Sequence, residues 1–122
     1  MTVFKFTKKQ RILSKHDFQK VFNQAEFRSS NRRILLLGRC NTLDSGRLGL
    51  VVPKKQLRRA VDRNLVKRLT REMFRHRQEE FIGLDVVLLV KGKFDSVELK
   101  TQFRHELGPL WDQLSSKVKR KP

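Results

Sequence analysis

Apolar residues gather in three short runs that predict buried strands. The runs span residues 34–37, 48–52 and 86–90, and each lies near a glycine. Runs of this length between turn-forming residues are typical of strands that are covered on both faces. Residues 41–46, NTLDSG, form a turn-forming segment between the first two runs. We therefore expect these two strands to pair as an antiparallel hairpin.

A helix is predicted before the first strand. Ser14 and Asp17 resemble a capping box with Asp in place of the usual Glu or Gln, which predicts a helix over residues 15–24. Leu13 lies where a hydrophobic staple to Phe18 would form. The apolar face of this helix, at spacings of three and four, comprises Phe18, Val21 and Phe22.

Two longer helices are predicted further along the chain. The first spans residues 60–80, which lack Gly and Pro, and the second spans residues 96–118. Gly108 and Pro109 should kink or split the second helix. Residues 1–12 form a basic arm, and residues 117–122 a basic tail that frays into solvent. The second helix would pack through Leu99, Phe103, Leu107, Leu110, Leu114 and Val118.

The resulting element order is α-β-β-α-β-α, an α+β fold in one domain over residues 1–122. The chain has 29 Lys and Arg against 12 Asp and Glu, a net charge of +17. Such an excess requires an anionic partner. With 38% hydrophobic residues and 9 Phe, the chain has enough apolar surface to fold.

The sequence also indicates the compartment. The single Cys40 cannot form an internal disulfide or a Cys-based zinc module, which favours the cytoplasm. The longest apolar run, residues 86–90, is far shorter than the ~20 residues that span a bilayer. No export signal is evident, and we expect no membrane association.

The helix over 60–80 has one apolar face and one cationic face. Residues 54–77 hold ten of the 29 Lys and Arg, where even placement would give about six. A merely solvated face would interleave opposite charges, yet only Glu72 lies at the margin of this one. Because Arg and Asn bind phosphate groups well, nucleic acid is the favoured partner class. The cationic sector comprises Asn64, Lys67, Arg68, Arg71 and Arg75, with Val66, Leu69 and Met73 opposite.

These residues resemble the signature of the bacterial ribonuclease P protein subunit. The resemblance covers about residues 9–115 and departs at Leu65, where the family usually has Arg after Arg63 and Asn64. Pro53 also lies where the family usually has a small residue. Because Leu65 replaces that Arg, the chain would forgo one RNA contact there. The matching segments are GRLGLVV at 46–52, KK at 54–55 and RRAVDRNLVKRLTREMFR at 58–75.

The resemblance implies a fold like the second domain of ribosomal protein S5, a two-layer sandwich with a left-handed β-α-β crossover. It implies a protein cofactor that binds a catalytic RNA and precursor tRNA, in a complex that removes the 5′ leader. The catalytic RNA would perform the hydrolysis with Mg²⁺, without a cofactor or metal on the protein. No obligate protein partner is implied.

The resemblance also implies two groups of RNA contacts. The single-stranded leader would bind in a cleft between the sheet and the first helix, lined by Phe18 and Phe22, with Lys91 contacting the leader. Core packing remains the alternative for the Phe pair, and Lys93 beside Lys91 could also contact RNA backbone. The catalytic RNA would be bound by Lys54, Lys55, Arg58, Arg59, Arg63, Asn64, Lys67, Arg68, Arg71 and Arg75.

No active site is evident on the chain itself. His16, His76 and His105 lie in three different predicted helices, and the adjacent Glu79 and Glu80 face different ways. A protein nuclease would need an acid–base set or grouped carboxylates. Two alternatives remain: a general RNA chaperone or ribosome-associated protein, and an autonomous nuclease, which the missing carboxylate cluster disfavours.

Overall fold

The structure is a computed structural model that describes residues 14–120. The predicted basic arm, the staple residue Leu13 and the last two residues lie outside the described residues. The first helix begins as predicted, because the Ser14 side chain accepts a hydrogen bond from the Asp17 amide at 3.0 Å. The elements are α1 (Lys15–Gln24), β1 (Phe27–Ser30), β2 (Ile34–Cys40), β3 (Arg47–Val51), α2 (Ala60–His76), the 3₁₀ helix η2 (Gln78–Phe81), β4 (Leu84–Val90) and α3 (Leu99–Arg120).

The four strands form one mixed sheet in the order β1-β2-β4-β3. The predicted hairpin of β2 and β3 is wrong, because β4 lies between them, antiparallel to β2 and parallel to β3. The pairing of β2 with β4 joins seven residues of each strand, from Ile34 opposite Val90 to Cys40 opposite Leu84. This apolar match outweighs the local turn signal in residues 41–46.

Sequence reasoning missed β1, which adds a strand to the predicted order. Its four residues pair antiparallel with β2, from Phe27 opposite Gly38 to Ser30 opposite Leu35. Phe27 and Ser29 are buried, and the two residues that alternate with them are exposed. Four residues with one large apolar side chain carry too weak a pattern to indicate a strand.

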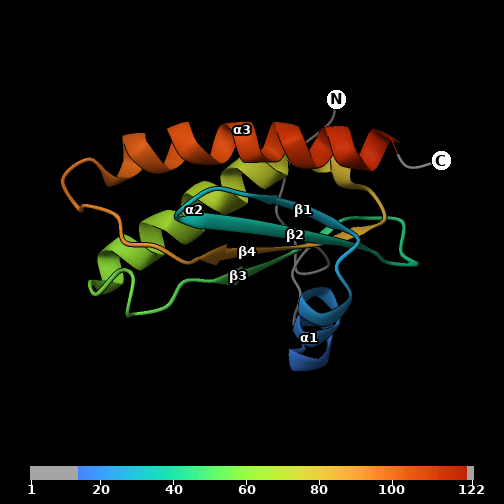
Figure 1. Cartoon of the computed structure of the whole chain (residues 1–122), viewed down its shortest axis with the longest axis horizontal. Coiled ribbons are helices and arrows are strands. Elements are labelled where there is room, and N and C mark those ends of the chain that lie inside the picture. Colours follow the sequence, from blue (N-terminus) through green and yellow to red (C-terminus); the bar gives the residue numbers. More distant parts are fainter. Residues whose placement is uncertain (1–13, 121–122) are drawn as a thin grey trace.

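The two faces of the sheet are covered differently (Figure 1). Helices α2 and α3 lie on one face and enclose the larger apolar cluster, which contains the aromatic residues Phe74, Phe81 and Trp111. Helix α1 lies on the opposite face over a smaller cluster. The ring centroids of Phe81 and Trp111 are 5.3 Å apart, so these aromatic side chains tie η2, which follows α2, to α3.

The predicted helix over residues 60–80 ends earlier. Helix α2 stops at His76, and the chain tightens into η2, where Phe81 packs 6.1 Å from Phe74 between ring centroids. Gly83 then has a φ of 77°, a conformation that side chains with a Cβ rarely adopt. This turn directs the chain from η2 into β4.

Helix α3 differs from its prediction in three respects. It begins at Leu99 rather than Ser96, and Ser96 lies before the helix, where its hydroxyl donates to Asp62 at 2.6 Å. It continues through Pro109 without being split, although proline lacks the backbone N–H of a helical hydrogen bond. The helix extends to residue 120, so the predicted tail is helical there, and Lys117 donates to the Arg28 carbonyl.

The α+β class is confirmed, with a helical layer of α2 and α3 on the sheet and α1 added on the other side. The parallel neighbours β3 and β4 are connected through α2. This is the unit for which the family resemblance implies a left-handed crossover, and the handedness stays a prediction. Among the described residues, no helix combines the length and apolar character of a membrane span.

Candidate nucleic-acid interface

A basic loop leads from β3 into α2. The amides of Gln56 and Leu57 both donate to the Pro53 carbonyl, at 3.1 and 3.2 Å, and this turn leaves Lys54 and Lys55 exposed. Arg58 and Arg59 follow and are also exposed. The loop therefore displays four of the predicted RNA-binding cations at the start of α2.

Asp62 fixes the first turn of α2. It is buried, accepts the hydrogen bond from Ser96, and lies 3.9 Å from the Arg59 guanidinium. A carboxylate in the first turn also interacts favourably with the positive end of the helix dipole. Sequence reasoning did not identify this link between α2 and the segment before α3, since an acidic residue in a basic stretch is normally a surface residue.

The two faces of α2 agree with the predicted arrangement. Val66, Leu69 and Phe74 are buried on one side, while Asn64 and Arg68 are exposed on the other. Lys67, Arg71 and Arg75 are half-buried, as is Met73, which was predicted to be central to the apolar face. The Arg68 guanidinium lies 3.9 Å from the Glu72 carboxylate, a distance that leaves it available to a stronger anion.

Arg63 is turned toward the protein. Its Nη1 donates to the carbonyl of Leu57 at 2.9 Å and to that of Arg58 at 2.7 Å. This side chain therefore holds the basic loop against α2, with its remaining donors available at the half-exposed surface. Sequence reasoning could not anticipate this arrangement, because main-chain acceptors carry no residue signature.

The two Phe residues of α1 differ in exposure. Phe18 is half-buried against the cluster of Val21, Leu35, Leu37 and Val87, so core packing accounts for part of its surface. Phe22 is 40% exposed. Lys91 is also exposed. It directly follows the last residue of β4, whereas the start of α1 lies near Asp85 at the other end of this strand. Phe22 is thus the more accessible stacking surface for a base.

An ion-pair network fixes α1 to the sheet. Arg47 on β3 lies between two carboxylates, with N–O distances of 2.7 Å to Asp85 and 3.3 Å to Asp17. Asn41 also donates to Asp85, at 2.8 Å. Hydrogen bonding to Asp85 raises the pKa of Arg47, and the Ser14 side chain and the Arg47 charge hold the pKa of Asp17 below its ordinary value of 3.8.

Sequence reasoning missed this network, although it had one signal. Asp85 is the acidic residue inside the apolar strand LDVVLLV and is nearly fully buried. A buried carboxylate needs a partner, so a conspicuous charge in a strand predicts a nearby cation without identifying it.

The described histidine and acidic side chains form no cluster that could hold a metal ion. His16, His76 and His105 are exposed on three different helices. Within residues 14–120, no three His, Cys, Asp or Glu side chains lie close enough together to hold a metal ion.

Comparison with known proteins identifies the family. Residues 6–115 match the profile of the Ribonuclease P family. The chain belongs to this family. A ribonuclease P protein component from Saccharophagus degradans is 39% identical over 96% of this chain and 86% of its own length. One from Alcanivorax borkumensis is 40% identical over 93% of both chains.

Solved ribonuclease P proteins share the fold. A mutant RNase P protein from Staphylococcus aureus superimposes with a TM-score of 0.70 at 26% identity, covering 86% of this chain and 87% of the other. The RNase P protein from Thermotoga maritima gives a TM-score of 0.63 at 27% identity over 92% and 97% of the two chains. The mixed sheet and its helices are therefore the ribonuclease P protein fold.

Proposed function

We propose that this chain is the RNA-binding protein component of ribonuclease P, which binds the catalytic RNA and the 5′ leader of precursor tRNA. The family and its relatives, named ribonuclease P protein components, assign the chain to tRNA processing. The observation that carries the finer proposal is the cationic face of α2 and its preceding loop, with a buried apolar face behind it.

This surface is suited to a folded RNA. Exposed Arg and Lys bind phosphates and release counterions, while Asn64 can hydrogen-bond a phosphate, sugar or base. In this proposal the predicted residues of α2 bind the catalytic RNA. Arg63 has a second role, because its hydrogen bonds to the Leu57 and Arg58 carbonyls hold the loop. Leu65 is half-buried and packs against the core, so it contributes apolar contact where the family usually has a cation.

The leader would bind on the face of the sheet that carries α1. An unpaired base can stack on Phe22, and stacking of this kind contributes about 1–3 kcal/mol per base with little sequence preference. Phe18 supports the same surface from its half-buried position. Lys91 would contact a phosphate of the leader at some distance from the nucleotide whose base stacks on Phe22.

In this proposal the catalytic RNA hydrolyses the phosphodiester bond, and the protein contributes binding. Mg²⁺ would be held by RNA phosphates, which supply the oxygen ligands that this ion prefers. The protein would act in the cytoplasm with the catalytic RNA and precursor tRNA as partners, and without an obligate protein partner.

Reconstitution tests this proposal. The purified protein is mixed with a bacterial ribonuclease P RNA at low Mg²⁺, and 5′-leader removal from a precursor tRNA is measured, with each component alone as control. We expect cleavage to be stimulated only in the mixture. Cleavage by the protein alone would reveal an autonomous nuclease. Binding without stimulation would favour an RNA chaperone or ribosome-associated protein.

Replacing Arg68 and Arg71 with Ala tests the role of α2. We expect weaker binding to the catalytic RNA and a log–log salt dependence that is shallower by about 2, because two counterions fewer are released. The matched control replaces Lys100 and Arg104, two exposed cations of α3, with Ala. An unchanged slope for the α2 variant would refute docking through this face.

A further inference from the structure

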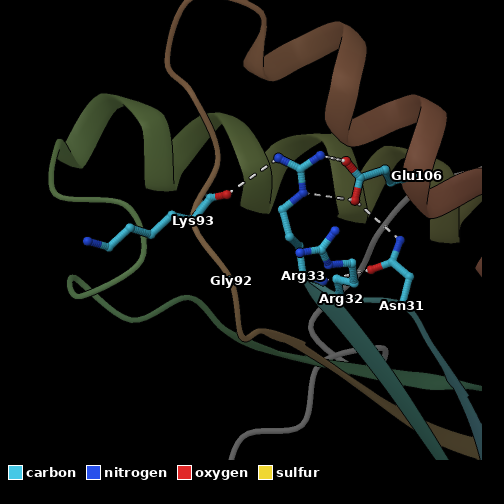
Figure 2. A pocket seen from close by; sticks show the side chains of 6 residues that line it. All are labelled: Asn31, Arg32, Arg33, Gly92, Lys93 and Glu106. Carbon is cyan, nitrogen blue, oxygen red and sulfur yellow. Dashed lines mark hydrogen bonds and ion pairs between the residues drawn. The ribbon is translucent and has the colours of Figure 1, made fainter.

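A second basic site lies at the end of the sheet where β2 begins and β4 ends. It is a pocket of about 630 Å³, within the ~300–1,000 Å³ typical of ligand sites. Neither the cationic face of α2 nor the leader surface includes it. Figure 2 shows its six lining residues, which come from the β1–β2 turn, the segment after β4 and helix α3: Asn31, Arg32, Arg33, Gly92, Lys93 and Glu106.

The β1–β2 turn is held by Asn31. Its Oδ1 accepts hydrogen bonds from the Arg33 amide at 2.9 Å and the Ile34 amide at 2.8 Å. Its Nδ2 donates to Glu106 of α3 at 3.2 Å. Both ends of the Asn31 side chain are therefore in use, and the turn that carries Arg32 is fixed against α3.

Arg33 is committed to the scaffold of the pocket. It forms an ion pair with Glu106, donates to the Lys93 carbonyl at 3.4 Å, and lies 4.5 Å from the centroid of the Phe94 ring (Figure 2). Glu106 is thus occupied by Arg33 and Asn31. The carboxylate of the pocket is already neutralised within the protein.

Gly92 brings the segment after β4 against this scaffold. A Cβ on Gly92 would lie 2.8 Å from Cγ of Arg33, closer than real Cβ atoms approach, and 3.0 Å from its Cα, which is a tight contact. The amides of Lys91 and Gly92 both donate to the Arg33 carbonyl, at 2.9 and 3.3 Å. Only glycine allows this approach, which places Lys93 beside the β1–β2 turn.

Two cations of the pocket remain unpaired. Arg32 and Lys93 are exposed, and neither side chain has a hydrogen bond or ion pair to any residue from 14 to 120. An exposed cation that no carboxylate of the protein neutralises attracts an anion such as a phosphate. Because the backbone that carries Arg32 and Lys93 is already fixed, binding an anion here would not have to order these loops.

Lys93 connects this pocket to the α2 surface. It also lines a neighbouring pocket of about 320 Å³ together with Lys55, Arg58 and Arg59. The unpaired cations thus continue the surface proposed for the catalytic RNA, and they do so on the α3 side of the sheet, opposite α1.

We propose that Arg32 and Lys93 bind backbone phosphates of the catalytic RNA, as a second contact region around the end of the sheet. The inference rests on the proposed function and adds a binding site in the β1–β2 turn and the segment after β4. The ligand chemistry is a phosphodiester, which precursor tRNA could also supply, and the experiment separates these two sources.

The test replaces Arg32 and Lys93 together with Ala and measures affinity for the catalytic RNA alone at 50 and 200 mM salt. Two lost phosphate contacts reduce the salt dependence, so wild-type affinity should fall about tenfold more over this range than that of R32A/K93A. Because both side chains are exposed, the thermal unfolding of the variant should match that of the wild type. The matched control is K100A/R104A, which should keep the wild-type salt dependence.

A wild-type salt dependence in R32A/K93A, or an equal loss in the control, overturns the pocket assignment alone. Failure of the wild type to bind the RNA or to stimulate leader removal overturns the proposed function and this site together. A second arm measures the affinity of the protein–RNA complex for precursor tRNA, with enough protein to saturate the catalytic RNA. There the complex with R32A/K93A should bind precursor tRNA as tightly as the wild-type complex does. A loss confined to that arm assigns the phosphate to precursor tRNA and overturns the proposal.

Discussion

The two faces of the sheet differ in how completely they are covered. On the face of α2 and α3, Phe74, Phe81 and Trp111 are inaccessible to solvent. On the face of α1, four buried residues form a small cluster, and the apolar residues Phe18, Val51 and Leu89 around it are only partly buried. The α2 and α3 face is the more completed core, because five partly buried apolar residues border its 20 buried ones, whereas three border only four on the α1 face.

This difference separates stability from binding. The completed core lets α2 turn its cations outward without loss of packing. The partly covered face carries the exposed Phe22 of α1, and Arg28 of β1, which is exposed, lies opposite Leu37 of the same cluster in the strand register. Apolar surface with a neighbouring cation is suited to unpaired bases and their phosphates.

The largest expected effect comes from breaking the completed core. Replacing Phe81 with Ala removes a ring that packs against both Phe74 and Trp111. We expect the free energy of unfolding to fall by about 3–5 kcal/mol, measured by urea denaturation. Phe22→Ala should change it by less than about 0.5 kcal/mol. Equal losses in the two variants would contradict the distinction between the faces.

The next effect comes from detaching α1. Arg47→Ala leaves the Asp85 carboxylate buried without its guanidinium and removes the pair with Asp17. Since the pair is partly exposed, we expect a loss of about 2 kcal/mol, less than the ~3–5 of a fully buried pair. Arg47→Lys keeps the charge and should lose less. Urea denaturation measures both, and an unchanged stability in Arg47→Ala would refute the anchoring role.

The features of the fold that depend on local sequence were predictable. The start of α1 follows from Ser14 and its hydrogen bond to the Asp17 amide, both within one turn. The faces of α2 follow from the helical period, so Asn64 and Arg68 were correctly assigned to the cationic side. Such features depend on residues three or four apart, which a single sequence displays directly.

Features that depend on distant partners were not predictable. The insertion of β4 between β2 and β3 depends on pairing residues about 50 positions apart, such as Leu36 with Leu88. The inward bonds of Arg63 go to carbonyl groups, which every residue carries. The pocket around Arg32 combines three segments whose proximity follows only from the assembled sheet.

The smallest expected effect concerns acid stability. The Ser14 side chain and Arg47 hold the pKa of Asp17 below 3.8, so its ionised form stabilises the fold above that pH. This contribution is lost as the pH falls through the lowered pKa of the folded state. Asp17→Asn should therefore reduce the decline in stability below about pH 4, measured by thermal unfolding across pH. An identical acid profile would show that Asp17 does not contribute.

The most direct test of the account is the affinity of the assembled ribonuclease P for precursor and mature tRNA with Phe22→Ala. Phe22 is chosen over Phe18 because its exposure separates binding from packing. We predict that precursor affinity falls about 5- to 150-fold, the equivalent of one lost base stack, with mature tRNA affinity unchanged. Ile82→Ala, which removes another exposed apolar side chain, should affect neither affinity. Equal losses on precursor and mature tRNA would contradict leader binding on the α1 face.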